Sequence, residues 1–185
     1  MALLTGIQLT PYIVAGMPTQ GLKLKQASAV LQIQPKELQN LVEYGVVKAR
    51  RLEGTYFFDT NALMVAKVAS HLKESLGLGT GTLVLSNLMR AFSASQEQFK
   101  SENPEYIFFK CQLTAEEESV KLGVPFRAFG EQIEERMNRA DLYKDVPRGK
   151  QRRGWTREFL EPLTDVAKDI GEVFKGVASD LFSSA

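Results

Sequence analysis

The 185-residue chain contains one cysteine, one histidine and one tryptophan. A single cysteine cannot form an internal disulfide, so a disulfide-stabilised fold is excluded. Cys111 and His71 together are too few ligands for the usual histidine and cysteine metal site, and we expect neither a metal nor a cofactor. We interpret Cys111 as a buried thiol in a strand, and His71 as a surface or structural histidine.

An excess of charge of one sign and long apolar runs are also missing. Lysine and arginine number 23 against 22 acidic residues, which gives a formal net charge of +1. Any binding to phosphates must therefore come from a local basic patch. No apolar run reaches the roughly 18 residues that span a bilayer, and the N-terminal stretch lacks the basic start of a signal peptide. We expect a cytoplasmic protein, nucleoid-associated when bound to DNA, with no membrane partner.

Residue patterns that carry catalysis are scarce. No nucleophile and base, and no pair of carboxylates, stand in an arrangement typical of covalent or acid–base catalysis. The stretch GLGTGT at 77–82 lacks the Lys-Ser/Thr ending and the preceding strand of a phosphate-binding loop. The glutamates at 116–118, 131, 134 and 135 are typical of a solvated surface. We therefore predict that the chain is not an enzyme.

The spacing of apolar residues predicts a mainly α fold with a small β component. Capping and turn residues support the boundaries: Pro35 suits a first helical turn, Gly45 a helix end and Asp59 a helix start. Glu53-Gly54 suits the turn of a hairpin. Helices are expected at about 24–31, 35–44, 60–76, 83–99, 127–143 and from 158 onward, with one strand at 7–14 and hairpins at 46–58 and 106–126.

These elements suggest a chain of several parts. We expect an N-terminal arm (1–21), a winged helix-turn-helix head (22–78), a module of a helix, a hairpin and a helix for dimerisation or effector binding (79–143), a basic linker (144–157) and a C-terminal amphipathic helix (158–185). The mixed unit at about 104–141 is too small to enclose a drug-sized ligand alone. An assembly role for the second half is therefore favoured over a small-molecule sensor.

The order of helix, short turn, helix, hairpin and helix is that of a winged helix-turn-helix. The second helix has an apolar face of Leu38, Leu41 and Val42, so its other face is free to enter a major groove about 12 Å wide. Hydrogen-bonding side chains that can contact base edges stand on or before this helix: Gln34, Lys36, Gln39 and Asn40. Glu37 either accepts from cytosine or caps the helix start.

Residues 22 to about 90 resemble the DNA-binding domain of MerR-type transcriptional regulators and of related excisionase-like proteins. The resemblance rests on an alanine in the first helix, the stretch EYGVVKARRLEGTYFFD (43–59) and the link LGLGTGTL (76–83). It implies a homodimer that binds a pseudo-palindrome in double-stranded DNA. It also implies backbone contacts from Arg50, Arg51 and Tyr56, with Lys48 nearby. Gln34 departs from the serine or aspartate usual there, and a hairpin, a helix and a tail replace the family's long dimer helix.

Two segments beyond the head allow more than one interpretation. The basic loop at 144–157 is either a solvated linker or a second phosphate contact through Lys150, Arg152 and Arg153. The last helix carries apolar residues at spacings of three and four: Phe159, Leu163, Val166, Ile170, Val173, Val177 and Leu181. This stripe packs on its own domain, pairs with a second copy as a coiled coil or docks on another protein.

The sequence alone therefore predicts a dimeric, sequence-specific DNA-binding protein, most simply a MerR-like transcriptional repressor. An alternative is a protein that marks DNA for a partner enzyme, as phage terminase small subunits and excisionases do, with the last helix recruiting that partner. A third is a protein-interaction adaptor that uses the winged domain. The operator, the regulated gene and any effector ligand stay open.

Overall fold

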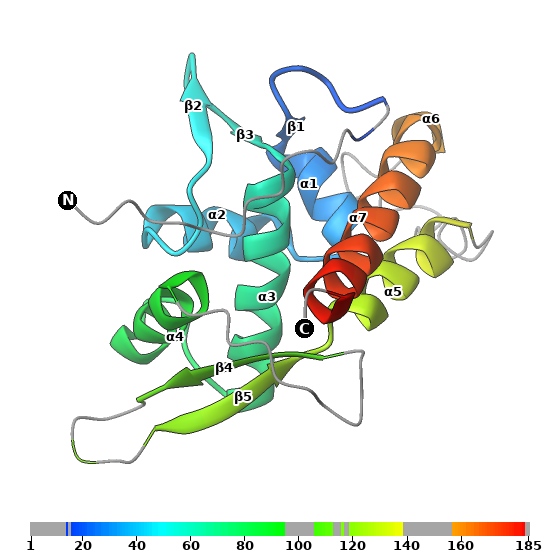
Figure 1. The fold of residues 1–185 in the computed structure, drawn as a ribbon. Helices are drawn as coiled ribbons and strands as arrows, with labels where there is room; N and C mark the ends of the chain where they lie inside the picture. The colour runs from blue at the N-terminus through cyan, green and yellow to red at the C-terminus, as the bar shows by residue number, and fades with distance from the viewer. Residues whose placement is uncertain are drawn as a thin grey trace.

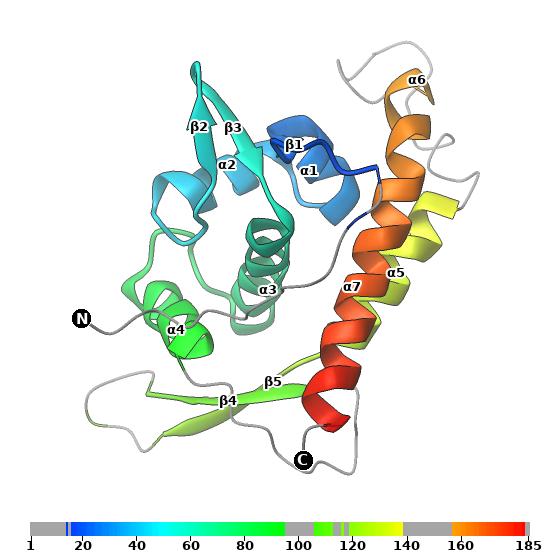
Figure 2. The same cartoon turned by 45° about the horizontal axis from the view of Figure 1, so that its top comes forward.

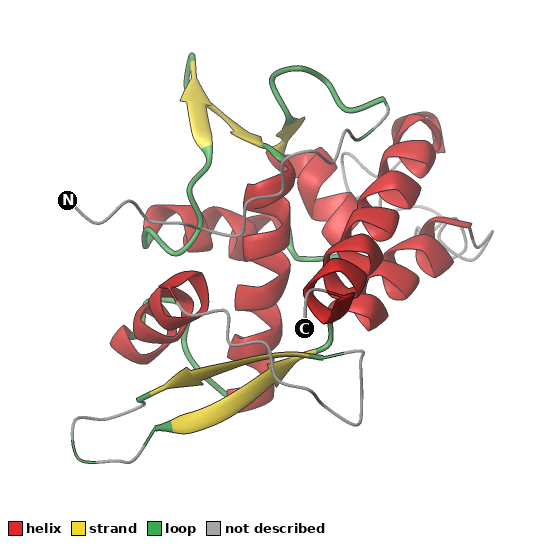
Figure 3. Ribbon diagram, in the orientation of Figure 1, coloured by secondary structure: helices red, strands yellow, loops and turns green. Residues whose placement is uncertain are grey.

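The computed structural model describes residues 14, 16–94, 106–112, 116, 119–138 and 157–183. This part of the chain is mainly helical, with two small antiparallel sheets (Figure 1, Figure 3). The helices are α1 (Leu24–Leu31), α2 (Pro35–Glu43), α3 (Thr60–Leu76), α4 (Leu83–Ala94), α5 (Phe126–Asn138), α6 (Arg157–Leu160), the short 3-10 helix η2 (Glu161–Leu163) and α7 (Thr164–Ser183). The strands are β1 (Leu22–Lys23), β2 (Arg50–Leu52), β3 (Thr55–Phe58), β4 (Ile107–Cys111) and β5 (Val120–Val124).

Capping and turn residues place the boundaries of several elements at the positions that the sequence predicts. The Asp59 carboxylate accepts a hydrogen bond from the Ala62 amide at 2.8 Å and caps α3. Pro35 stands in the first turn of α2. Glu53 and Gly54 have φ of 47° and 80°, the left-handed pair of a type I′ turn, which suits the twist of the β2–β3 hairpin. The predicted helices at 24–31, 35–44 and 60–76 and both hairpins are confirmed.

The first sheet has a strand that the sequence analysis missed. β1 pairs with β3, which places β3 between β1 and β2. Gly21 precedes β1 with φ of 92°, and a Cβ atom there would lie 2.5 Å from the carbonyl oxygen of Phe58. Only glycine allows this approach. A strand of two residues is too short to show alternation, which explains the omission, and the strand predicted at 7–14 lies outside the described residues except for Val14.

The last predicted helix is not continuous. The chain runs through α6 and η2 before α7 begins at Thr164, and Pro162, which lacks an N–H, stands in the break. Of the predicted stripe, Phe159 is half-buried and the next five positions are buried: Leu163, Val166, Ile170, Val173 and Val177. The side chain of Leu181 lies outside the described part.

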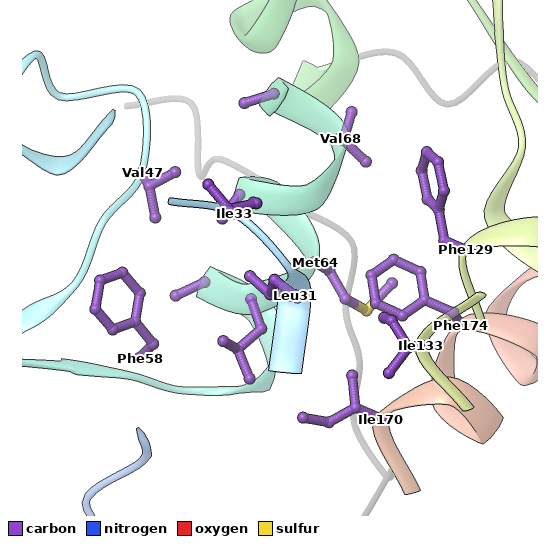
Figure 4. Close-up of a cluster of buried hydrophobic side chains, with 14 of the residues drawn as sticks. Leu31, Ile33, Val47, Phe58, Met64, Val68, Phe129, Ile133, Ile170 and Phe174 are labelled. Carbon is purple, nitrogen blue, oxygen red and sulfur yellow. The ribbon is translucent and has the colours of Figure 1, made fainter. Parts of the chain in front are cut away.

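The stripe of α7 packs in cis, along α5 (Figure 2). Two glycines allow the close crossing, because a Cβ atom on Gly130 would lie 2.4 Å from the carbonyl oxygen of Gly171. In the core, Met64 of α3 lies beside Ile133, Ile170 and Phe174 of this helix pair (Figure 4). The helix pair thus packs against the three-helix unit of α1, α2 and α3. Of the three interpretations of the stripe, the structure shows the first, packing on its own domain. In the described part, no helix has the length and apolar character to cross a bilayer.

Candidate nucleic-acid interface

Helix α2 presents polar side chains outward, as predicted from its spacing. Leu38 and Leu41 are fully buried, whereas Lys36 is exposed and Gln39 and Asn40 are half-buried. The Gln39 amide donates to the Glu43 carboxylate at 2.6 Å along the outer face. Gln34 is exposed at the start of the helix and makes no side-chain capping bond. The four predicted base-contacting residues therefore lie at the start of α2 or on its solvent side.

Glu37 lies on the side of α2 that faces α3. Its Oε1 accepts a hydrogen bond from Lys73 Nζ at 2.8 Å and one from Ser70 Oγ at 3.2 Å, both on α3. It therefore neither caps the helix nor faces solvent. The pairing could not be predicted from the sequence, because the partners are separated by more than 30 positions.

The two adjacent arginines of the hairpin lie on opposite faces. Arg50 is directly across from Phe57, and Arg51 is across from Tyr56, and neighbouring residues of a strand alternate between faces. The guanidinium of Arg51 lies over the ring of Tyr56, 5.5 Å from its centroid. Tyr56 shares its face with Phe58, which is fully buried. Arg51 is therefore on the side of the hairpin that faces the helices, and Arg50 is on the outer side.

A groove of about 580 Å³ joins the hairpin to α1 and α2. Its walls come from the start of α1, from Gln39 of α2 and from Gly54, Thr55 and Tyr56 of the hairpin. Phe159 of α6 also contributes to it. Lys23 and Lys25 line the groove and are exposed, and neither is among the residues predicted from the sequence to contact DNA. The signal that could have found them is a pair of lysines at the N-terminus of the first helix of a helix-turn-helix.

The charge of this surface differs from that of the chain as a whole. Between residues 22 and 58, two acids are exposed, Glu43 and Glu53, and the third, Glu37, is paired with Lys73. The same segment exposes six cations: Lys23, Lys25, Lys36, Lys48, Arg50 and Arg51. This segment of the near-neutral chain therefore carries a local excess of exposed positive charge, which suits a polyanion, and Lys23 and Lys25 place part of it at the groove.

The other predicted positions lie elsewhere. Lys150, Arg152 and Arg153 are outside the described residues. Cys111 is buried in β4, and burial raises the pKa of its thiol, so the prediction of a buried strand thiol is confirmed. His71 is half-buried, with its ring edge-on to Phe129 at 5.2 Å between centroids. Among the described residues, no group of three histidine, cysteine or acidic side chains could hold a metal ion.

No known protein family model, characterised protein sequence or solved structure matches this chain.

Proposed function

We propose that this protein binds double-stranded DNA sequence-specifically, through a winged helix-turn-helix formed by α1, α2, the β2–β3 hairpin and α3. The observation that carries the proposal is the groove at which the start of α1, the polar face of α2 and the hairpin meet. The exposed Lys23 and Lys25 line it, and Arg51 lies over Tyr56 in its wall. A duplex presents phosphates on both sides of its major groove. A helix flanked by two cationic elements matches that pattern.

In this proposal, the residues divide between base and backbone contacts. Gln34, Lys36, Gln39 and Asn40 have the donors and acceptors that contact base edges in the major groove. Lys23, Lys25, Lys48, Arg50 and Arg51 contact phosphates, together with the phenol of Tyr56. Phosphate contacts supply affinity and register without sequence information, so base choice lies with α2.

The packing of α7 favours a regulator over a recruiter. A recruiter of the type considered above presents the last helix to a partner enzyme, but the apolar stripe of α7 is buried against α5 as far as its side chains are described. We therefore propose a transcriptional regulator that acts as a homodimer on a pseudo-palindrome. Its dimer surface lies outside the buried stripe of α7.

The decisive experiment is selection from a pool of randomised duplexes by the full-length protein, followed by measurement of binding to the selected duplex against salt concentration. We expect a selected consensus, and an affinity that falls steeply with salt. The variant Gln39→Ala/Asn40→Ala should lose preference for the selected duplex over a scrambled one while its salt dependence stays unchanged.

The hairpin variant Arg50→Ala/Arg51→Ala should bind selected and scrambled duplexes more weakly to a similar degree, with a salt slope smaller by about one to two. Arg90, exposed on α4, provides the matched control Arg90→Ala, which should behave as wild type. Failure of the wild-type protein to bind any duplex at low salt would refute the proposal.

A further inference from the structure

A second cavity, of about 410 Å³, lies between the α1–α2 turn, α3 and α5. Its chemistry comes from Gln32 in the turn, from Lys67, His71 and Glu74 on α3, and from Phe129 and Arg136 on α5. It is separate from the groove beside the hairpin, with which it shares no residue. The cavity forms where α5 meets the head, and not within the second half of the chain alone.

The cavity is rich in donors that lack acceptors. Gln32 Nε2 is buried, and no partner for it lies among the described residues. Lys67 Nζ donates one hydrogen bond, to the carbonyl oxygen of Leu31 at 3.2 Å, and lies over the Phe129 ring at 5.6 Å. An ammonium has three donors, so a single acceptor leaves it undersatisfied.

The cations of the cavity also lack a directly bound acid. In the part of the chain that is described, no carboxylate lies within ion-pair distance of Lys67 or of Arg136. Burial lowers the pKa of Lys67; Glu74 raises it, and Arg136 lowers it. A buried cation such as Lys67 is normally paired, because without a partner it forfeits its hydration without compensation. Arg136 is exposed and keeps its hydration.

We propose that this cavity binds a small oxyanion, a carboxylate or phosphoryl group of a metabolite, held by Lys67, Arg136 and Gln32. The anion supplies the acceptors that Gln32 Nε2 and Lys67 Nζ lack. Arg136, which lines the cavity and is exposed, adds a second positive charge. The formal balance of the site supports an anion, because Lys67 and Arg136 outweigh Glu74 and His71 gains charge when it is protonated. The volume accommodates a compact dicarboxylate or a phosphorylated small molecule but not a nucleic acid.

The position of Gln32 gives the site a route to α2. Gln32 ends α1 in the left-handed conformation, with φ of 60°, and only Ile33 and Gln34 separate it from α2. An anion bound to Gln32, Lys67 and Arg136 ties this turn to α3 and α5, and so changes how firmly α2 is oriented. This coupling rests on the proposed function, whereas anion binding itself does not.

The site is tested first without DNA. Thermal unfolding and calorimetric titration of the full chain would use inorganic phosphate and succinate as probes, with sodium chloride at equal ionic strength as the reference. We expect both probes, or the one whose chemistry fits, to raise the midpoint of unfolding above the chloride reference. Arg136→Gln and Lys67→Met should each weaken the affinity for that probe at least tenfold, while Arg90→Gln should leave this affinity unchanged.

Two results would overturn the site. One is a response to phosphate and succinate that equals the response to chloride, and the other is wild-type affinity in Arg136→Gln. Because Arg136 is exposed, this variant should fold even if Lys67→Met, which strips the Leu31 carbonyl of its donor, does not.

The coupling is tested with the duplex selected as above. At constant ionic strength, a saturating probe should change the affinity of wild-type protein for that duplex at least threefold and leave Arg136→Gln unaffected. Equal affinity of wild-type protein for the duplex with and without the probe would refute the coupling but not the anion site. Anion binding by a protein that binds no duplex would refute the proposed function alone.

Discussion

Lys73 Nζ lies 2.8 Å from Glu37 Oε1 and joins α3 to the inner side of α2. Both side chains are largely shielded, with 22% and 19% of their surfaces exposed, and Ser70 donates to the same carboxylate oxygen. The pair lies on the side of α2 that faces α3, apart from the exposed Lys36. It therefore sets how the polar face is presented without contacting a ligand there.

Breaking this pair should destabilise the protein and loosen α2. We expect Glu37→Gln and Lys73→Met each to lower the free energy of unfolding by about 1–2 kcal/mol, because a shielded charge loses its partner. Urea unfolding of both single variants and the double variant would give the coupling energy. If the changes in free energy of unfolding of the two single variants add up to that of the double variant, the contact between Glu37 and Lys73 contributes nothing to stability. Lys36→Met, exposed on the same helix, is the control.

The two hairpin arginines should differ in their effect on DNA binding. Arg51 lies on the face of Tyr56, which lines the groove, whereas Arg50 lies on the outer face with Phe57. We expect Arg51→Ala to reduce the salt slope of duplex binding by about one and Arg50→Ala to reduce it less. Arg51→Lys keeps the charge but changes the stacking on Tyr56 and should lie between Arg51→Ala and wild type. Equal losses for the two alanine variants would contradict this assignment of faces.

The glycine crossing of α5 and α7 should not tolerate a methyl group. A Cβ atom on Gly130 meets the backbone of α7, which cannot move aside as a side-chain end can. Alanine adds up to about 1 kcal/mol of helix propensity, but overpacking costs about 1–3 kcal/mol, so we expect Gly130→Ala to be destabilising. Urea unfolding would measure the change, with the exposed Glu131→Ala on the same helix as the control. Unchanged or increased stability would show that α7 does not pack here in solution.

His71 should make stability depend on pH near neutrality. Burial lowers its pKa below the ordinary 6.5; Glu74 opposes this shift and Lys67 adds to it, and Arg136 on α5 lines the same cavity. The folded state then binds fewer protons than the unfolded state, so stability is full above about pH 6.5 and falls as the pH drops from there toward the lowered pKa.

His71 is the only histidine in the chain, so one variant isolates its effect. The difference in free energy of unfolding between wild type and His71→Gln should change between pH 7.5 and pH 5.5, with wild type losing more stability on acidification. If the free energies of unfolding of the two proteins change with pH in parallel, the lowered pKa of His71 is refuted. An oxyanion in the cavity should oppose the loss, because it stabilises the protonated imidazole.

Much of the local structure was predictable because its causes act within a few residues. The Asp59 cap, Pro35 in the first turn of α2 and the Glu53-Gly54 turn each depend on side chains and backbone angles that are close in sequence. The burial of Leu38 and Leu41 likewise follows from helical spacing. That Arg50 and Arg51 lie on opposite faces of the hairpin could also have been predicted, because neighbouring residues of a strand alternate between faces.

Contacts between distant residues were not predictable in the same way. The pairing of Glu37 with Lys73, the addition of β1 to β3 and the donors gathered around Lys67 each need elements that only the folded chain brings together. A polar residue on a helix has no local property that distinguishes an inward ion pair from an outward base contact. Glu37 shows this most clearly, because its neighbours Lys36 and Gln39 lie on the outer side.

The sequence by itself determined the mainly helical character, the ends of the helices in the head and the amphipathic stripe of the last helix, since propensity, capping and periodicity are local properties of the chain. Only the tertiary structure decided what covers that stripe. The apolar face of α7 is equally suited to α5, to a second copy or to a partner, because hydrophobic burial has no directional preference. Close approach at Gly130 and Gly171 selected α5, and the same packing brought Arg136 to the cavity beside the α1–α2 turn.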